Sequence, residues 1–311
     1  MNPIQLQTFV NQNPKLVKVK SFTVNNRELQ VLKYSKQVFY KNLWNDALEW
    51  CRGTVVDSDF NLVSVPFQKI YNYGIEERAP KIAPETKVTA YRKVNGFMAQ
   101  ITWHKDTLII GTTGSLGGDY VQYIKDMMEY HAPIEKWETW MQAHSDETHL
   151  FECVHPNDPH IIPENAGMYY LGSRTKQYDA IHSEHGLHRV CQIQMRAIEL
   201  GCFATEGYVD IEFHHIENMV KQCKHEGFVI YQKNGNATKL KSQWYLVQKW
   251  VARNPNTDKI MNNQIFNQVD EEYYGLIHYL RAHIEHYTAL DEQNRLEFVR
   301  QYFASSANKP E

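Results

Sequence analysis

The sequence lacks the features that mark secreted, disulfide-built or membrane proteins. Its five cysteines include no Cys-x-x-Cys pair and are odd in number, which favours buried free thiols in a reducing compartment. No apolar run approaches the roughly 20 residues that span a bilayer. Residues 1–5 show no basic segment leading into an apolar one, as a secretory signal would. We therefore expect a cytoplasmic protein with no membrane association.

The chain also lacks a surplus of positive charge, internal repeats and low-complexity segments. Lysine and arginine number 33 against 36 aspartate and glutamate, for a formal charge of −3. This balance argues against a broadly basic nucleic-acid coat, although it allows a local basic groove. With 311 residues, of which 42% are hydrophobic and 22% charged, the chain can form one large or two modest soluble domains.

Hydrophobic patterning predicts an α+β fold that ends in helices. Helical spacing is found over residues 119–143 with a break at Pro133, and over 3–14, 183–201, 214–224 and nearly all of the chain after Lys241. Strand-like runs occupy residues 22–24, 29–34, 53–57, 62–65, 88–111, 150–154, 168–172 and 227–232. We place a boundary near residues 243–256, which divides the chain into domains of residues 1–245 and 246–311.

Four short motifs follow one another, each beside a strand-like run. They are Lys93-Val94-Asn95-Gly96, Phe151-Glu152, Glu226-Gly227-Phe228-Val229-Ile230 and Lys239-Leu240-Lys241. Each motif alone has an ordinary structural explanation. Their shared order and context instead favour a site at which an enzyme lysine bonds covalently to a nucleotide.

The basic residues of these motifs suit nucleotide transfer to lysine. A nucleophilic amine must be uncharged, whereas the pKa of free lysine is about 10.4. We expect positive neighbours and partial burial to lower the pKa of Lys93. Gly96 would let the backbone approach a nucleotide closely. Lys239 and Lys241, two apart on a strand, would project to one face and reach the α-phosphate, where charge builds in the transition state.

The acidic residues of these motifs are candidates for binding the ribose and the metal ion of a nucleotide. Glu152 lies in a strand of β-branched and aromatic residues, where an ionised side chain requires a partner. A ribose hydroxyl is one candidate. Glu226 opens the next strand motif and is a candidate oxygen ligand for Mg²⁺.

Three further segments extend the pattern. Residues 46–56 are DALEWCRGTVV and residues 66–72 are PFQKIYN, and Tyr170-Leu171-Gly172-Ser173-Arg174 follows Glu152. Over roughly residues 30–245, the ordered set resembles the covalent nucleotidyltransferases, which include ATP-dependent DNA and RNA ligases and mRNA-capping guanylyltransferases. Within them it resembles most the RNA ligase class typified by the tRNA-repair ligase of T-even phages.

The resemblance implies a fold and a set of residue roles. Residues 1–245 would form a nucleotidyltransferase (adenylylation) domain of antiparallel sheets with flanking helices and an ATP site between the sheets. Residues 246–311 would form a small all-α domain. The catalytic residues would be Lys93, which takes the AMP, and Lys239 and Lys241. Nucleotide contacts would come from Arg52, Lys69, Asn95, Gly96, Glu152 and Glu226, and Glu226 would also contact the metal.

The implied activity is ATP-dependent RNA ligation. Such an enzyme forms a lysyl-AMP, passes the AMP to an RNA 5′-phosphate and seals that end to a 3′-hydroxyl, with Mg²⁺ or Mn²⁺. RNA repair, including tRNA repair, fits this class. A separate end-healing kinase or phosphatase is a candidate partner, and a monomer is our default expectation.

The chain departs from the phage pattern at two positions. Asn95 replaces an acidic residue, and Thr113 replaces a lysine that precedes Gly114-Ser115. Two alternatives remain open. A capping guanylyltransferase or DNA ligase would carry an OB barrel after the Lys-x-Lys strand, where this chain is predicted to be helical. A non-catalytic RNA-binding relative is suggested only by Asn95.

Overall fold

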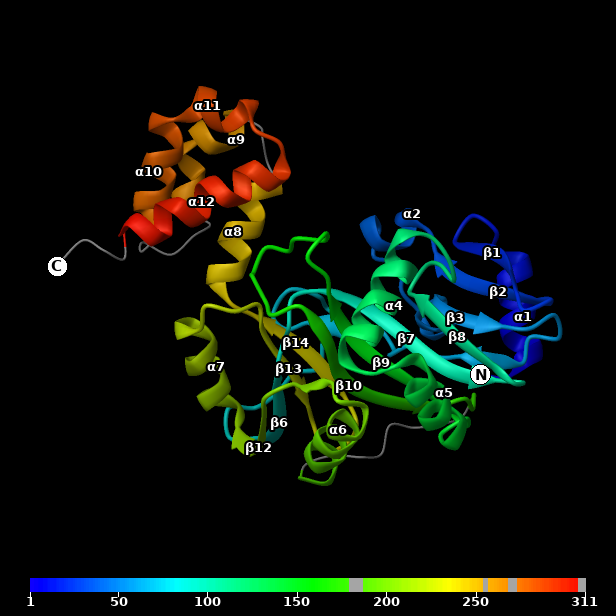
Figure 1. The fold of residues 1–311 in the computed structure, drawn as a ribbon. Helices are drawn as coiled ribbons and strands as arrows, with labels where there is room; N and C mark the ends of the chain where they lie inside the picture. The colour runs from blue at the N-terminus through cyan, green and yellow to red at the C-terminus, as the bar shows by residue number, and fades with distance from the viewer. Residues whose placement is uncertain (179–186, 254–256, 268–272, 307–311) are drawn as a thin grey trace.

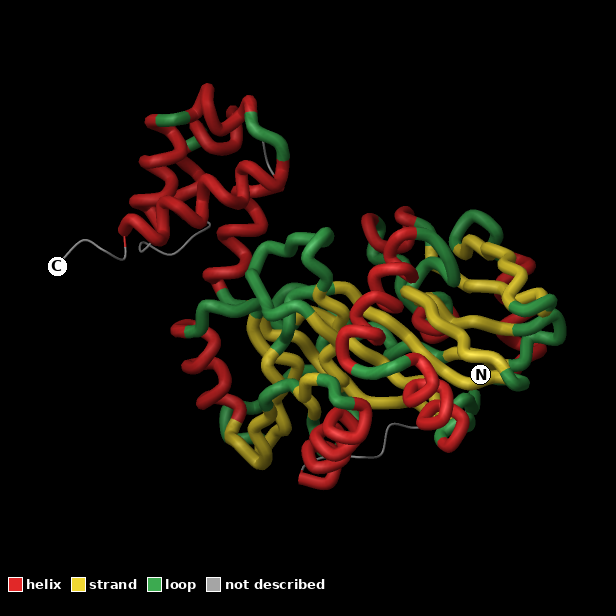
Figure 2. The backbone as a smooth tube through the Cα atoms, viewed as in Figure 1, coloured by secondary structure: helices red, strands yellow, loops and turns green. Residues whose placement is uncertain are grey.

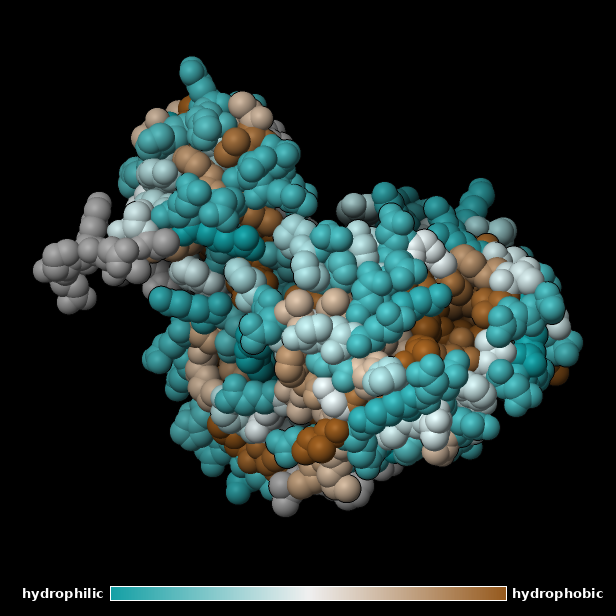
Figure 3. Space-filling view, in the orientation of Figure 1, coloured by the Kyte–Doolittle hydropathy of each residue, from teal (hydrophilic) through white to brown (hydrophobic). Residues whose placement is uncertain are grey.

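In the computed structural model, three β-sheets form the main body and helices lie outside them (Figure 1). The structure describes residues 1–178, 187–253, 257–267 and 273–306. Figure 2 shows the strands gathered centrally, and Figure 3 shows mostly hydrophilic side chains on the same face. Within the described ranges, no helix is both long and apolar enough to cross a membrane.

The first sheet is antiparallel and has the order β1-β2-β3-β4. Its strands are β1 (Val17–Val24), β2 (Arg27–Tyr34), β3 (Arg52–Val56) and β4 (Leu62–Ser64). One of its faces packs on α1 (Pro3–Gln12), α2 (Lys36–Tyr40) and α3 (Asp46–Trp50). Helix α1 begins there because Asn2 and Gln5 form a capping box and Pro3 occupies the first turn.

The second sheet has the order β11-β10-β9-β7-β8. Its strands are β7 (Phe97–His104), β8 (Thr107–Thr112), β9 (Glu147–Val154), β10 (Gly167–Thr175) and β11 (Phe203–Ala204). The largest apolar core of the described residues lies between this sheet and α4 (Asp119–His131), α5 (Ile134–Ala143) and α6 (Leu187–Leu200). The predicted break at Pro133 is where α4 gives way to α5.

The third sheet has the order β12-β6-β13-β14-β5. Its strands are β5 (Tyr71–Asn72), β6 (Lys87–Arg92), β12 (Gly207–Glu212), β13 (Gly227–Tyr231) and β14 (Ala237–Lys241). Helix α7 (Phe213–Gln222) covers one face through Phe213, Ile216 and Val220. The opposite face carries the motifs of interest.

Every element described after the last strand is a helix, as predicted. These helices are α8 (Gln243–Arg253), α9 (Thr257–Met261), η1 (Asn263–Asn267), α10 (Tyr274–Ala282), α11 (Ile284–Ala289) and α12 (Glu292–Ser306). They share an apolar core and stand away from the sheets, with α8 leading into them (Figure 1). They touch the main body at the β9–β10 loop, where Arg300 donates to the carbonyl oxygen of His160 at 2.6 Å.

The α+β prediction is thus confirmed, with antiparallel sheets, flanking helices and a helical C-terminal region. Three short strands, β5, β11 and β12, were not predicted. Strands β5 and β11 have two residues each, too few for a period to show. In β12 the register shifts between Tyr208 and Ile211, which breaks the alternation. Residues 183–186 of one predicted helix lie outside the described residues.

Candidate active site

Lys93 follows directly on β6 and lies between two carboxylates. Its backbone N–H donates to the carbonyl oxygen of Gly227 at 2.8 Å, which ties it to the start of β13. Its Nζ atom lies 3.1 Å from Oε2 of Glu226 and 3.8 Å from Oε1 of Glu152. Three of the predicted motifs therefore meet at one amine.

The expected lowering of the Lys93 pKa is not what the structure shows. Burial does lower the pKa of this ammonium, but the charges of Glu152 and Glu226 raise it by more. The net pKa lies above that of a free lysine, so this arrangement holds Lys93 charged. The prediction was wrong because it considered the positive neighbours and overlooked how closely two carboxylates approach.

Glu226 is the centre of this charge cluster and is only 2% exposed. Its Oε2 accepts from Lys93 and, at 2.7 Å, from Nδ2 of Asn95, while Lys241 lies 3.1 Å from Oε1. Burial raises the pKa of Glu226, but the two ammonium groups lower it below the usual range. A metal ion at Glu226 would have to share oxygens that already serve three protein donors. The metal role of Glu226 therefore stays a prediction.

Asn95 is held by the protein at both ends of its amide. In addition to the bond to Glu226, its Oδ1 accepts from the backbone N–H of Ile162 at 3.0 Å. Asn95 thus positions Glu226 and links it to the β9–β10 loop. Its predicted contact with a nucleotide remains a prediction.

Gly96 brings the loop after Lys93 into contact with β9. Its N–H donates to Oε1 of Glu152 at 3.1 Å, and burial raises the pKa of that carboxyl. A Cβ atom on Gly96 would lie 2.3 Å from the carbonyl oxygen of Cys153. Glycine is therefore required for this close approach, and the ribose role of Glu152 remains a prediction.

Substitution Gly96→Ala is expected to destabilise the protein by about 1–3 kcal/mol, because the backbone of β9 would have to shift. Denaturant unfolding measures this change. Gly117→Ala is the matched control, since nothing lies within 4 Å of a Cβ there. Equal stability of the two variants would contradict the contact.

Lys239 and Lys241 stand on β14 opposite Val229 and Gly227 of β13. The two lysines have different surroundings. Lys241 pairs with Glu226, whereas burial, followed by the charges of Arg52, Lys93, Lys241 and Lys69, lowers the pKa of Lys239 to about 7. In this arrangement Lys239 is thus the lysine most easily deprotonated near neutral pH.

This pKa predicts how Lys239 affects stability. Between about pH 7 and 10.5, Lys239 binds more protons in the unfolded chain than in the folded one. The buried charge of Lys239 therefore destabilises the fold less as pH rises through this range. We expect Lys239→Met to raise the denaturant midpoint at pH 6, with a gain that fades toward pH 10. Lys233→Met, at a side chain 75% exposed, is the control. A gain independent of pH would contradict the lowered pKa.

A cavity of about 290 Å³ lies at these residues and between the sheets. Its walls come from β3, β6, β7, β9, β10, β13 and β14. Lining residues include Arg52, Tyr91, Lys93, Met98, Thr113, Glu152, Leu171, Val229 and Lys239. The predicted site residues Arg52, Lys93, Glu152 and Lys239 therefore share one cavity, and Arg52 is held there by bonds to the carbonyl oxygens of Phe67 and Gln68.

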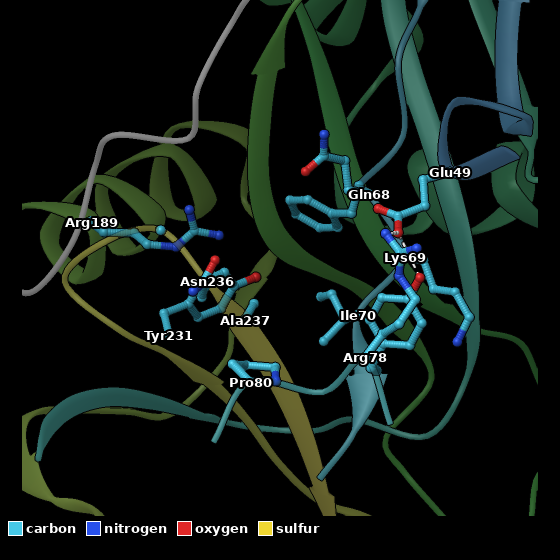
Figure 4. A pocket seen from close by; sticks show the side chains of 13 residues that line it. Glu49, Gln68, Lys69, Ile70, Arg78, Pro80, Arg189, Tyr231, Asn236 and Ala237 are labelled. Carbon is cyan, nitrogen blue, oxygen red and sulfur yellow. Dashed lines mark hydrogen bonds and ion pairs between the residues drawn. The ribbon is translucent and has the colours of Figure 1, made fainter. Parts of the chain in front are cut away.

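Lys69 lies in a second cavity of about 290 Å³, which shares Phe67, Gln68, Ile70 and Tyr231 with the first (Figure 4). It is paired with Glu76 and lies over the ring of Tyr71, 4.0 Å from its centroid. Its role at a triphosphate remains a prediction.

Arg189 forms the opposite wall of this second cavity and was not predicted (Figure 4). It is 6% exposed, lies over Tyr231, and finds no hydrogen-bond partner for Nε or Nη2 among the described residues. No motif surrounds it in the sequence, so only the tertiary structure connects it with the site.

The fold is similar to that of ATP-dependent ligases of known structure. Two structures of an archaeal ATP-dependent RNA ligase, forms 1 and 2, each match with a TM-score of 0.59 at 12% and 11% identity. They align with 90% and 94% of this chain and with 76% and 77% of theirs. A proposed ATP-dependent DNA ligase from Aquifex aeolicus matches with a TM-score of 0.55 at 14% identity, over 97% of this chain and 75% of its own. No protein-family model and no curated protein matches the chain.

Proposed function

We propose that this protein is an ATP-dependent RNA ligase that joins 5′-phosphate and 3′-hydroxyl ends through a lysyl-AMP intermediate. The observation that carries the proposal is the position of Lys93, at the cavity wall between Glu152 and Glu226 with Lys239 and Lys241 on the strand beside it. Lys93, Glu152 and Lys239 line the cavity, and Glu226 and Lys241 form ion pairs behind it. Such a cluster suits nucleotide transfer to lysine better than ordinary core packing, which does not gather buried charge.

In the first step Nζ of Lys93 would attack the α-phosphorus of ATP. The nitrogen–phosphorus bond forms, the bond from that phosphorus to the bridging oxygen breaks, and pyrophosphate leaves. Before the attack the ammonium must lose a proton, and Oε2 of Glu226, at 3.1 Å, is the acceptor within hydrogen-bond reach.

The cations of the cavity would stabilise the phosphates. Lys239 and Arg52 line it and carry no acidic partner within 4.0 Å among the described ion pairs. Fixed positive charge at the α-phosphate lowers the energy of the transition state. ATP would enter with Mg²⁺ or Mn²⁺, whose charge offsets that of the phosphates, and Glu226 is the predicted metal contact.

Two later steps would complete the reaction. An oxygen of the RNA 5′-phosphate attacks the AMP phosphorus and Lys93 leaves. The 3′-hydroxyl of the other end then attacks the 5′-phosphorus, AMP leaves, and a phosphodiester bond remains. The choice of RNA is supported by the likeness to the archaeal RNA ligase and by the motif resemblance to the phage tRNA-repair class.

The remaining expectations belong to this proposal. They are a role in RNA or tRNA repair, a separate end-healing kinase or phosphatase as partner, a monomeric state, a cytoplasmic location, and domains of residues 1–245 and 246–311. The helical segment after β14 supports an RNA ligase over a capping guanylyltransferase or a DNA ligase, because no OB barrel is found among the described residues there.

The test is to label the covalent intermediate. The protein is incubated with Mg²⁺ and ATP radiolabelled at the α-phosphate, denatured and separated by size, with labelled GTP in parallel. We expect label from ATP that comigrates with the chain and passes to a 5′-phosphorylated RNA. Label from GTP alone would indicate a capping guanylyltransferase. No label from either nucleotide, across several divalent metals, would overturn the enzymatic proposal.

A further inference from the structure

Basic side chains stand in register across the first sheet. Strand pairing places Lys18 of β1 opposite Lys33 of β2, and Lys33 opposite Arg52 of β3. Lys18 and Lys33 therefore lie on the same face of the sheet, about 4.8 Å apart from strand to strand. The pair of Lys33 with Arg52 comes just after a register shift between Leu32 and Lys33, so Arg52 continues the row as the neighbouring basic residue on β3. Lys20, two residues along β1, lies on that face too. We call Lys18, Lys20, Lys33 and Arg52 the cationic row.

The cationic row ends at the nucleotide cavity. Arg52 lines that cavity, and so does Thr113 of the loop after β8. The Nζ atom of Lys33 lies against the next residue of this loop, since a Cβ on Gly114 would be only 2.5 Å away. Lys18 and Lys20 are exposed on β1, the edge strand, at the side of the molecule (Figure 1). The row thus leads from open solvent to the cavity wall.

The three lysines of the row, Lys18, Lys20 and Lys33, have no ion-pair partner among the described residues. Burial lowers the pKa of Lys33, and the charges of Lys20 and Lys18 lower it further, so these lysines do affect one another. Like charges directly opposite across two strands are destabilising. Such a pair of facing lysines is expected where an anion binds, because the anion offsets the repulsion between them.

We propose that the cationic row binds the phosphate backbone of the RNA strand whose end enters the cavity. The proposal rests on the proposed function and extends it from the nucleotide to the second substrate. A polynucleotide suits the row because it carries negative charges in succession, as the row carries positive ones. The contacts are to phosphates, so the row would guide the strand without reading its sequence.

The proposal is tested by measuring RNA binding to a variant that reverses two charges of the row, Lys18→Glu with Lys20→Glu. Binding of a single-stranded RNA with a 5′-phosphate and a 3′ fluorophore is followed by anisotropy at several salt concentrations. Each phosphate contact to a single strand contributes about 0.7 to the slope of log K against log salt, so we expect the slope to fall by about 1.4. For single-stranded DNA of the same sequence, the slope should fall by a similar amount in this variant, because the contacts are to phosphate.

The control reverses two other exposed lysines, Lys221 on α7 and Lys233 in the β13–β14 turn. This variant should keep the wild-type affinity and slope. The melting temperature of the Lys18→Glu, Lys20→Glu variant should not fall, because opposite charges would then face each other at Lys33. An unchanged RNA affinity and slope in that variant would overturn the proposal.

The lysyl-AMP label separates this proposal from the proposed function. Neither Lys18 nor Lys20 lines the cavity, so the variant should form the label as the wild type does while transferring it to RNA more slowly. If the wild type forms no label, the proposed function fails, yet the binding comparison still decides whether the row holds nucleic acid.

Discussion

A Lys93→Arg variant is expected to form no covalent AMP adduct at all while keeping a folded, stable protein. Arginine preserves the positive charge that Glu152 and Glu226 surround, but its guanidinium stays protonated and cannot act as a nucleophile. The labelling assay with α-phosphate-labelled ATP measures the loss, and a melting curve measures the stability.

Lys93→Ala is the companion variant. It should also form no adduct, but it leaves Glu226 and Glu152 without their shared cation and is expected to lower the melting temperature as well. The arginine variant therefore separates chemistry from folding. If label persisted in it, the nucleophile would lie elsewhere. Lys239 would be the next residue to replace, because its pKa of about 7 leaves much of it neutral at physiological pH.

A Glu226→Ala variant is expected to lose about 3–5 kcal/mol of stability and nearly all adduct formation. Removing one partner of a buried ion pair leaves an uncompensated charge. Here Lys241 loses its paired carboxylate and Lys93 loses the nearer of its two. The 2% exposure of Glu226 means that water does little to replace it. Denaturant unfolding measures the first effect, and the labelling assay measures the second.

Two further variants make this test specific. Glu138→Ala, at an exposed position on α5, should change stability by no more than about 0.5 kcal/mol. Adding Lys241→Ala to Glu226→Ala should cost less than the two single changes together, because the residues form one pair. Strict additivity, or a loss as small as that at Glu138, would contradict the role of Glu226 as the counterion of the cluster.

Much of the site could be predicted because its residues come in local motifs. Lys93 follows a strand, Glu152 lies within one, and Lys239 and Lys241 stand two apart, all in segments whose periodicity is visible in the sequence. Once each strand is recognised, the face that a residue shares with its neighbour two positions away follows from geometry. These residues do come together, while their catalytic roles remain predictions.

Other features depend on distances between segments far apart in the chain. Lys69 is paired with Glu76 and lines a second cavity, and Arg189 faces that cavity from α6 without any motif around it. The cationic row depends on strand register, which joins Lys18 to Lys33 and Lys33 to Arg52. No short pattern in the sequence encodes that register.

The sequence by itself determined the α+β fold, most of the strands and helices, and the residues from which the candidate site is built, because alternation, helical spacing and motif order are properties of short segments. Only the tertiary structure decided the state of the charges. Lys93 is held charged, opposite to the expectation, whereas the pKa of Lys239 is lowered to about 7. The reason is physical: a pKa follows from burial and from the distance to each neighbouring charge, and both are set only when the three sheets pack together.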